Sequence, residues 1–151
     1  MKIEQAIKSS FVNDNQKAMV NVLYTAAWVG QRQQEFFKPF KITLAQYNVL
    51  RILKGQHPNP ISVAEVINRM IDKSSNASRI IDRLEKRRLV TRHVCKKDRR
   101  QVDVLISSEG LKLLEEMNPS LQTMEQSLIG LNATELTELN NLLDKFRNQK
   151  K

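Results

Sequence analysis

The stretch HVCKKDRRQVDVLIS, residues 93–107, decides the fold, because it has the pattern of a β-hairpin with a charged tip. Runs rich in β-branched residues lie on both sides of the tip, at residues 90–95 and 102–106. In the second run apolar side chains alternate with polar Gln101 and Asp103, which predicts a strand with one buried face. Four cations and one carboxylate fill the tip, and repulsion between like charges makes such a tip unfavourable for stability alone. We therefore expect the hairpin to carry a function.

Two short helices are predicted to precede the hairpin. Apolar residues recur at i, i+3, i+4 and i+7 in both, which is the spacing of one buried helix face. The two sets are Val63, Val66, Ile67 and Met70 and, after a polar break at residues 72–75, Ala77, Ile80, Ile81 and Leu84. With a further helix that begins at Thr43, the order helix, short helix, turn, helix and hairpin predicts a winged helix-turn-helix, which we expect over residues 43–107.

Capping sequences predict where several helices begin. Thr43, Ser62 and Asn132 each stand three residues before a Glu or Gln, which is the pattern of a capping box. Ser107 or Ser108 begins a further helix in the same way, but without the reciprocal partner.

Amphipathic segments flank the winged unit on both sides, at residues 13–37 and 108–147. Within the second segment Pro119 predicts a helix end after Met117, and Gly130 predicts another. A winged unit closes its own core, so extra apolar helices must bury their faces elsewhere, and a second copy of the chain is the economical partner. We expect a single domain over residues 1–151, mainly α with a small β-hairpin wing, that forms a homodimer through N- and C-terminal dimerisation helices.

The charge of the chain is concentrated in one segment. Of the net charge of +9, residues 79–100 account for +7, with ten cations against three carboxylates. This concentration points to an anionic partner, and a winged helix-turn-helix narrows the class to double-stranded DNA.

Other classes of protein are disfavoured by what the sequence lacks. It contains no long apolar run and no signal peptide, so we expect a cytoplasmic protein with no membrane partner. It has two histidines, no Gly-rich phosphate loop and no Ser-His-Asp or Cys-His set, so we expect no enzymatic activity, no cofactor and no metal.

The polar face of the second helix, which is predicted to begin near Ser74, suits the major groove of DNA. Short hydrogen-bonding side chains lie at its start, where a helix faces phosphate, and longer arginines follow. A solvated helix face is the alternative for any such stripe, but the position ahead of a basic hairpin favours DNA contact. The residues expected to bind DNA here are Lys73, Ser74, Ser75, Asn76, Ser78, Arg79 and Arg83.

The hairpin tip is expected to reach the neighbouring minor groove, whose negative potential attracts arginine. Arg100 is the candidate for insertion. Asp98, two residues earlier on the same side of an extended chain, can fix the direction of Arg100 through a bidentate bond. Lys96, Lys97 and Arg99 are expected to contact phosphates. The alternative is a generic solvated turn.

Residues 72–110, DKSSNASRIIDRLEKRRLVTRHVCKKDRRQVDVLISSEG, resemble the MarR family of bacterial transcriptional regulators. The resemblance covers the recognition helix, the DRR wing and the LIS-x-x-G that leads into the next helix. It implies a homodimeric regulator, a repressor in our interpretation, that binds a palindromic operator and is often released by a small ligand or an oxidant. One departure is Arg88, which stands where the family commonly has glycine and must take or avoid the left-handed cap conformation.

The resemblance also places small phenolic or other aromatic effectors where the dimer helices meet the winged unit. The aromatic residues expected there are Trp28, Phe36, Phe37, Phe40 and Tyr47. Aromatic residues at helical spacing are more often part of the core. Cys95 is a candidate oxidant sensor beside several cations, although the peroxide-sensing members carry their cysteine near the N-terminal dimer helices. A small inert side chain is the alternative for Cys95.

The rival interpretation is a winged helix that serves as a protein-interaction or RNA-binding module without operator specificity. The serine-rich helix face lacks the aromatic residues that protein interfaces favour. The basic segment likewise lacks exposed aromatic residues that stack on RNA bases.

Overall fold

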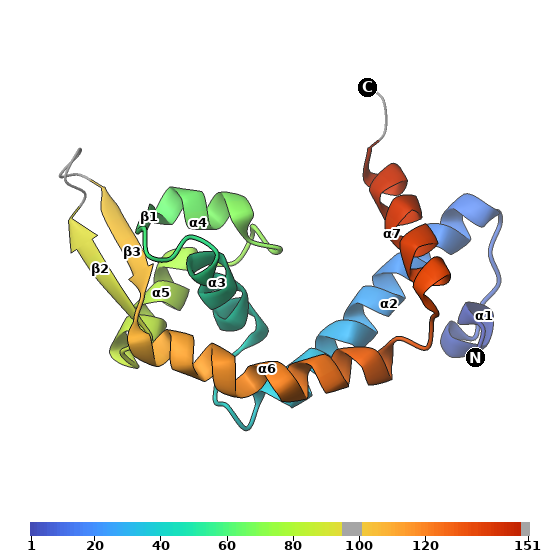
Figure 1. The fold of residues 1–151 in the computed structure, drawn as a ribbon. Helices are drawn as coiled ribbons and strands as arrows, with labels where there is room; N and C mark the ends of the chain where they lie inside the picture. The colour runs from blue at the N-terminus through green and yellow to red at the C-terminus, as the bar shows by residue number, and fades with distance from the viewer. Residues whose placement is uncertain (95–100, 149–151) are drawn as a thin grey trace. The chain divides into compact units, whose positions relative to one another are not determined.

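The computed structural model describes residues 1–94 and 101–148 (Figure 1). Its elements, in chain order, are α1 (Ile3–Ile7), α2 (Asp14–Phe37), α3 (Leu44–Lys54), β1 (Ile61–Ser62), α4 (Val63–Arg69), α5 (Ala77–Lys86), β2 (Val90–Val94), β3 (Val102–Ile106), α6 (Ser108–Leu128) and α7 (Ala133–Arg147). The chain divides into two compact units, residues 1–115 and 116–151, and α6 crosses the boundary. The first unit contains the winged helix, so the predicted fold class, mainly α with a small β-hairpin, is confirmed.

The capping sequences begin helices at the predicted positions. Thr43 and Asn132 each form a capping box with the Gln or Glu three residues later. The Ser62 hydroxyl accepts from the Glu65 N–H (3.2 Å), while the Glu65 carboxylate binds Arg69 one turn further on. Local hydrogen bonding therefore sets the starts of α3, α4 and α7.

The core of the first unit lies where α3, α4 and α5 pack on the sheet. Nearly fully buried side chains come from each of these helices and from two strands: Val49, Leu50, Leu53, Val66, Ala77, Ile81, Leu84, Val90, Val104 and Ile106. The apolar faces that the spacing predicted for α4 and α5 are thus the faces that are buried.

Three antiparallel strands form the sheet, in the order β1-β3-β2. β2 and β3 make the predicted hairpin, with Val90 opposite Ile106 and Val94 opposite Val102. β1 pairs with the other edge of β3, where Ile61 lies opposite Val104. The sequence did not predict β1, because two residues are too few to show an alternation.

A Schellman motif ends α5, and its left-handed residue is an arginine. The Leu89 N–H donates to the Leu84 carbonyl (3.0 Å), and the Arg88 N–H donates to the Glu85 carbonyl (2.8 Å). Arg88 has a φ of 60°, so of the two possibilities left open at this position the chain takes the left-handed cap. The buried Leu89 then begins the path into β2.

Gly110, in the first turn of α6, lies close to the backbone that follows α5. A Cβ at this position would lie 2.3 Å from the Leu89 carbonyl oxygen and 2.7 Å from Cγ1 of Ile106. The Ser107 hydroxyl accepts from the Gly110 N–H (3.0 Å) and donates to the Arg88 carbonyl (2.7 Å). The predicted serine cap of α6 is confirmed, and it joins the helix start to the end of α5.

Pro119 lies inside α6, so the prediction that a helix ends after Met117 was wrong. A proline inside a helix removes one backbone hydrogen bond, but burial can outweigh that loss. Leu114, Met117 and Leu121 form one buried row that continues past the proline. The Thr123 hydroxyl also donates to the Pro119 carbonyl (3.0 Å).

Large apolar side chains on α2 and α7 are exposed in the single chain. On α2 they are Met19, Val22, Leu23, Tyr24 and Trp28, and on α7 they are Leu139, Leu142 and Phe146. α7 has no buried residue at all. Most of the stability of a helix in a protein comes from packing of its apolar face, which these faces lack within the described chain.

Candidate nucleic-acid interface

A tight polar turn precedes α5, and it corrects the predicted helix start. The Asp72 carboxylate accepts from the Ser74 N–H (2.9 Å), the Ser74 hydroxyl (2.6 Å) and the Ser75 hydroxyl (2.8 Å). The helix begins at Ala77 rather than near Ser74, and Asn76 is its N-cap, accepting from the Arg79 N–H (3.0 Å). Aspartate and serine compete for backbone partners in this way, which holds residues 72–75 outside the helix.

The same hydrogen bonds tune the acidity of Asp72. The hydroxyl of Ser74, followed by that of Ser75, stabilises the charged carboxylate and lowers the pKa of Asp72 below its ordinary value. Ser74 and Ser75, two of the three serines predicted to bind DNA, are therefore held by an ionised neighbour near neutral pH. Lys73, Ser74 and Asn76 are exposed around this turn, and Ser75 is half-buried.

Nine of the ten residues of α5 fall into three parallel rows, and half-buried Ile80 lies between the third row and the first. Each row has the spacing i, i+4, i+7, and neighbouring rows are about 100° apart around the helix. The first row is buried, the second contacts β2 through two carboxylates and the Ser78 backbone carbonyl, and the third is exposed and cationic. In that order they are Ala77, Ile81 and Leu84, then Ser78, Asp82 and Glu85, then Arg79, Arg83 and Lys86. We call the third set the cationic row.

The side chains of the cationic row form no ion pair among the described residues, 1–94 and 101–148. Lys86 was not among the predicted DNA-binding residues, although its spacing from Arg79 and Arg83 could have identified it. An exposed row of cations is suited to an anionic ligand.

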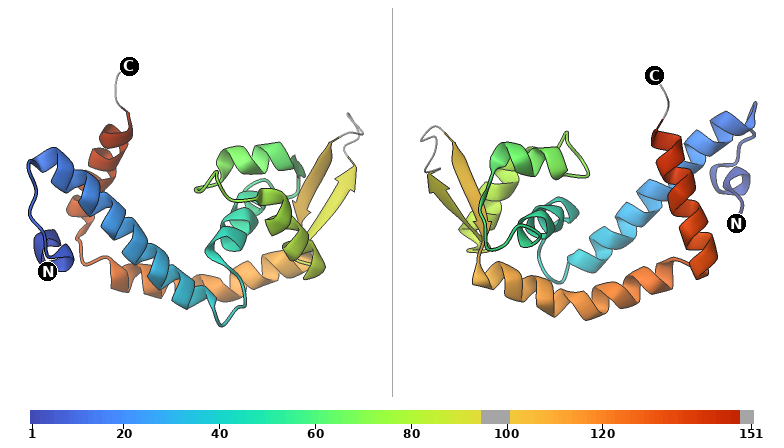
Figure 2. Two further views of the ribbon diagram at one scale, coloured as in Figure 1. Left: turned by 180° about the vertical axis from the view of Figure 1, so that it is seen from behind. Right: turned by 45° about the horizontal axis from the view of Figure 1, so that its top comes forward.

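Arg92 of β2 bridges the hairpin to the second row of α5. Its guanidinium pairs with the Asp82 carboxylate, donates to the Ser78 carbonyl (3.3 Å), and has Nε 3.6 Å from Oε2 of Glu85. Figure 2 shows α5 and the hairpin side by side. This role of Arg92 was not predicted from the sequence, although the alternation along the strand indicates it, because Arg92 shares a strand face with buried Val90.

Arg87 also binds within the protein. Its guanidinium donates to the backbone carbonyls of Phe40 and Lys41, in the segment between α2 and α3. Two of the cations counted in the basic segment, Arg87 and Arg92, therefore hold structural elements together.

The predicted wing-tip residues lie outside the described residues. They are Lys96, Lys97, Asp98, Arg99 and Arg100, and the candidate sensor Cys95 lies there too.

Four of the five predicted effector-site aromatic residues contact one another. The ring of Phe37 stacks on Tyr47, with centroids 4.5 Å apart, and Phe36 contacts both Phe37 (5.2 Å) and Phe40 (5.5 Å). Phe37 is fully buried and thus part of the core, whereas Trp28 on α2 is 38% exposed.

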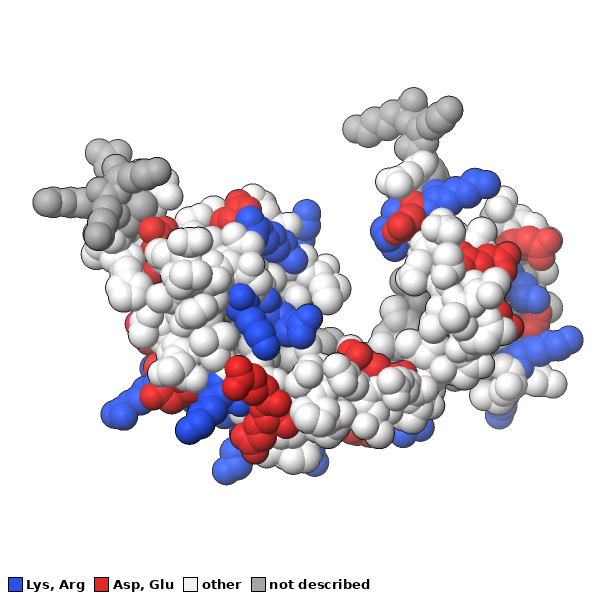
Figure 3. Space-filling model, viewed as in Figure 1, with Lys and Arg blue, Asp and Glu red and all other residues white. Residues whose placement is uncertain are grey.

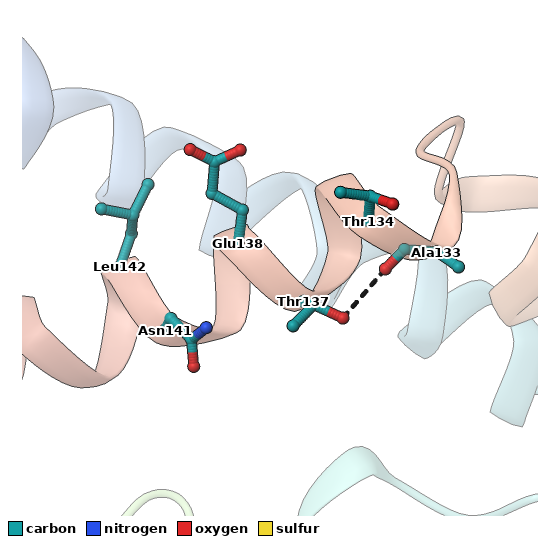
Figure 4. Close-up of a pocket in the computed structure, with 6 residues that line it drawn as sticks. All are labelled: Ala133, Thr134, Thr137, Glu138, Asn141 and Leu142. Carbon is teal, nitrogen blue, oxygen red and sulfur yellow. Dashed lines mark hydrogen bonds between the residues drawn. The ribbon is translucent and has the colours of Figure 1, made fainter.

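A shallow, open depression lies on one helix of the second unit (Figure 4). All its lining residues belong to α7: Ala133, Thr134, Thr137, Glu138, Asn141 and Leu142. The Thr137 hydroxyl donates to the Ala133 carbonyl (3.0 Å). None of these residues is aromatic, so this depression is unrelated to the predicted effector site.

Three further observations on the described part of the chain concern its surface charge, its capacity to hold a metal ion and its capacity to cross a membrane. On the face seen in Figure 3, Lys and Arg side chains are interspersed with Asp and Glu and form no single basic field. Among the residues with described positions, no group of three or more His, Cys, Asp or Glu is placed to hold a metal ion. No helix in the described part of the chain is long and apolar enough to cross a membrane.

Comparison with known proteins identifies relatives of this arrangement. A model of the MarR family matches residues 40–101. The crystal structure of a MarR transcription factor from Planctomyces limnophilus is 31% identical, with a TM-score of 0.70, and the match covers 89% of this chain and 98% of that one.

Two further relatives are regulators with known names. BpsR from Bordetella bronchiseptica, whose DNA binding is regulated by 6-hydroxynicotinic acid, is 30% identical with a TM-score of 0.74, over 86% of this chain and 93% of that one. The HTH-type transcriptional regulator PapX from Escherichia coli is 29% identical over 94 residues. That match covers 62% of this chain but only 57% of the length of PapX.

The chain has the order of elements of a winged helix, with α5 directly before the hairpin, and its likeness to a MarR transcription factor spans nearly all of that protein. The chain therefore belongs to the MarR family of DNA-binding transcriptional regulators.

Proposed function

We propose that this chain is a homodimeric repressor that binds a palindromic operator. In each half-site α5 enters the major groove and the β2–β3 hairpin reaches the adjacent minor groove. The proposed contacts are those predicted from the sequence, Lys73, Ser74, Ser75, Asn76, Ser78, Arg79, Arg83, Lys96, Lys97, Asp98, Arg99 and Arg100, with Lys86 added. A repressor of this kind acts on DNA in the cytoplasm and catalyses no reaction.

The cationic row of α5 is the observation that carries this proposal. Its three side chains are exposed, form no ion pair among the described residues and stand opposite the buried row of the same helix. An α-helix with this arrangement can offer side chains to base edges and phosphates at the same time. The β2–β3 hairpin, which Arg92 joins to α5, provides a second element for contact with DNA beside this helix.

A homodimer accounts for the apolar faces of α2 and α7. Leu23 is 66% exposed and Leu142 is 55% exposed, which is unfavourable for side chains of this size unless a partner covers them. A two-fold dimer places its recognition helices about 34–36 Å apart, so half-sites should be separated by about one turn of DNA.

A small aromatic effector is the proposed signal for release. Phe36, Phe40 and Tyr47 are half-buried around the fully buried Phe37, and their rings lie near the segment that leads from α2 into the winged helix. BpsR, a relative at 30% identity, responds to an aromatic acid. A panel of hydroxylated aromatic acids, including 6-hydroxynicotinic acid, should contain compounds that release the bound duplex.

Selection from random nucleic acids tests the proposal. The full chain is incubated separately with random duplex and random single-stranded pools, and bound sequences are read. We expect a palindromic duplex motif to be enriched. Enrichment of single strands alone, or of nothing, would favour the rival RNA-binding or protein-interaction module.

Salt dependence and substitution give a second readout on the selected duplex. With about six to ten phosphate contacts per dimer, affinity should fall on the order of a thousandfold between about 50 and 200 mM salt. Arg79→Ala and Arg83→Ala should each weaken binding by about 1–3 kcal/mol. Arg147→Ala, an exposed arginine on α7, is the control and should leave affinity unchanged.

A further inference from the structure

We propose that Arg92 is a positioning residue for DNA binding, which fixes the hairpin against α5 so that both elements engage DNA together. The proposal rests on the proposed function, because it requires α5 and the hairpin to bind one duplex. Arg92 itself is not assigned a contact with DNA. Its role is to set the angle between the two elements that make those contacts.

The core alone does not fix the direction of the hairpin. Val90, Val104 and Ile106 are buried at its base, but Val94 is 64% exposed and Val102 is 41% exposed at its far end. Arg92 lies between these two regions of β2, opposite buried Val104. On β2 it is therefore the side chain that continues the contact with α5 past buried Val90, at the level of Val104 and before the exposed far end.

The contacts of Arg92 are suited to fixing the angle between the hairpin and α5. The guanidinium reaches a carboxylate and a backbone carbonyl one turn apart on α5, Asp82 and Ser78, and lies 3.6 Å from Glu85 a turn further along. A planar group with several fixed donors restricts orientation more than a single point charge does. The Arg92 side chain is 29% exposed, less than Asp82 at 49%, so solvent competes for it only in part.

Because of the position of Asp82, the direction in which DNA affinity changes when its carboxylate is removed tests the proposal. Asp82 lies in the row next to the cationic row, so its negative charge is adjacent to the proposed DNA surface. If charge alone mattered, removing this carboxylate would strengthen binding to a polyanion. If Asp82 holds Arg92 and thereby the hairpin, removing it must weaken binding.

The experiment measures affinity for the duplex that the wild-type chain selects from the random pool. Asp82→Ala and Arg92→Gln should each lower that affinity at least tenfold, and the double variant should bind no more weakly than Arg92→Gln alone. Arg92→Lys keeps the charge but not the planar fork, and should restore affinity in part. Glu65→Ala is the matched control, since it breaks an ion pair of similar exposure within α4, and should change affinity less than twofold.

Footprinting separates positioning from general damage. In Asp82→Ala and Arg92→Gln, hydroxyl-radical protection at the outer edges of the site, under the hairpins, should be lost. Methylation protection of guanine N7 in the major groove, under α5, should remain. Circular dichroism and thermal melting establish that each variant is folded, and Asp82→Ala, which places a good helix former on α5, serves if Arg92→Gln does not fold.

The outcomes distinguish the two proposals. If the wild-type chain selects no duplex, the proposed function fails, and the role of Arg92 fails with it. If the wild-type chain selects a duplex and Asp82→Ala binds it as tightly or more tightly, the positioning role alone is overturned. The same holds if the effects of Asp82→Ala and Arg92→Gln simply add, or if both protections are lost together.

Discussion

Arg88 occupies a backbone conformation that suits glycine. Its φ of 60° places the Cβ near the following carbonyl oxygen, and this costs an L-residue about 1–2 kcal/mol. The Schellman bonds of Arg88 and Leu89 and the bond from the Ser107 hydroxyl to the Arg88 carbonyl hold the residue there. The local strain is offset by contacts that glycine would keep, because all of them involve the backbone of residue 88.

Arg88→Gly should therefore stabilise the protein. Relief of the left-handed conformation outweighs the added freedom of glycine in the unfolded chain, and we expect the free energy of unfolding to rise by about 0.5–1 kcal/mol. Urea denaturation followed by circular dichroism measures the change. Arg88→Ala retains the strain and removes the same charge, so an equal rise in that variant would show that charge rather than conformation is responsible.

Asp72 offers a test of the turn before α5 that does not depend on DNA. Its pKa is lowered because the charged carboxylate accepts bonds from Ser74 and Ser75, so the turn gains stability above the unfolded-state pKa and loses it as pH falls through the folded-state pKa. A carboxyl-carbon NMR titration should give a pKa for Asp72 below its ordinary value. In Ser74→Ala the pKa should rise toward that value, and an unchanged pKa would mean that the turn is not held as described.

At the scale of elements, the junction between α5, the hairpin and α6 depends on close backbone approach. Gly110 allows the first turn of α6 to lie against the Leu89 carbonyl, and Ser107 fastens the same place with two hydrogen bonds. A side chain at position 110 would have to displace the Leu89 backbone oxygen, which can move less easily than the end of a flexible side chain.

Gly110→Ala should destabilise the protein by about 1–3 kcal/mol, since its Cβ would lie 2.3 Å from a backbone oxygen. Gly55→Ala is the matched control: Gly55 has a φ of −65°, and a Cβ there meets nothing closer than 3.5 Å. We expect the control to change the free energy of unfolding by less than about 0.5 kcal/mol. Equal effects in chemical denaturation would contradict the crowding at Gly110.

The elements that the sequence predicted well are those with a local cause. The spacing of Ala77, Ile81 and Leu84 identified the buried face of α5, and the caps at Thr43 and Asn132 identified helix starts. Pro119 was misjudged because a local rule for proline was overridden by burial along α6. Such burial depends on distant segments, which the local pattern does not contain.

The candidate site was predicted in part for the same reason. Arg79 and Arg83 follow from helix periodicity, so sequence reasoning placed them on an exposed face. The contacts of Arg92 with α5 and of Arg87 with the carbonyls of Phe40 and Lys41 join residues that are 7 to 47 positions apart along the chain. These residues come together only when the chain has folded. A count of cations along the chain could not separate these two arginines from those left exposed.

At the scale of the whole molecule, the apolar faces of α2 and α7 remain without cover in a single chain. Leu139 is 41% exposed on α7, and its neighbours Leu142 and Phe146 are more exposed still. The proposed homodimer explains why a chain of 151 residues carries such helices at both ends.

Leu139→Asp should convert the dimer to a monomer, because it places a charge in the proposed interface, and operator affinity should fall with it. Asn141→Asp adds the same charge to a different side of α7, about 160° away from position 139 by helix geometry. This control should stay dimeric. Sedimentation velocity measures both variants, and a wild-type chain that sediments as a monomer at micromolar concentration would refute the homodimer.

The three rows of α5 divide one helix among three tasks that share no side chain. The side chains of residues 77, 81 and 84 serve the core, the carboxylates of Asp82 and Glu85 serve the hairpin together with the Ser78 carbonyl, and residues 79, 83 and 86 face outward. Under the proposed function, mutations confined to the outward set would alter the preferred operator and leave folding intact. New regulatory circuits could thus evolve, or be designed, through a few substitutions on an unchanged scaffold.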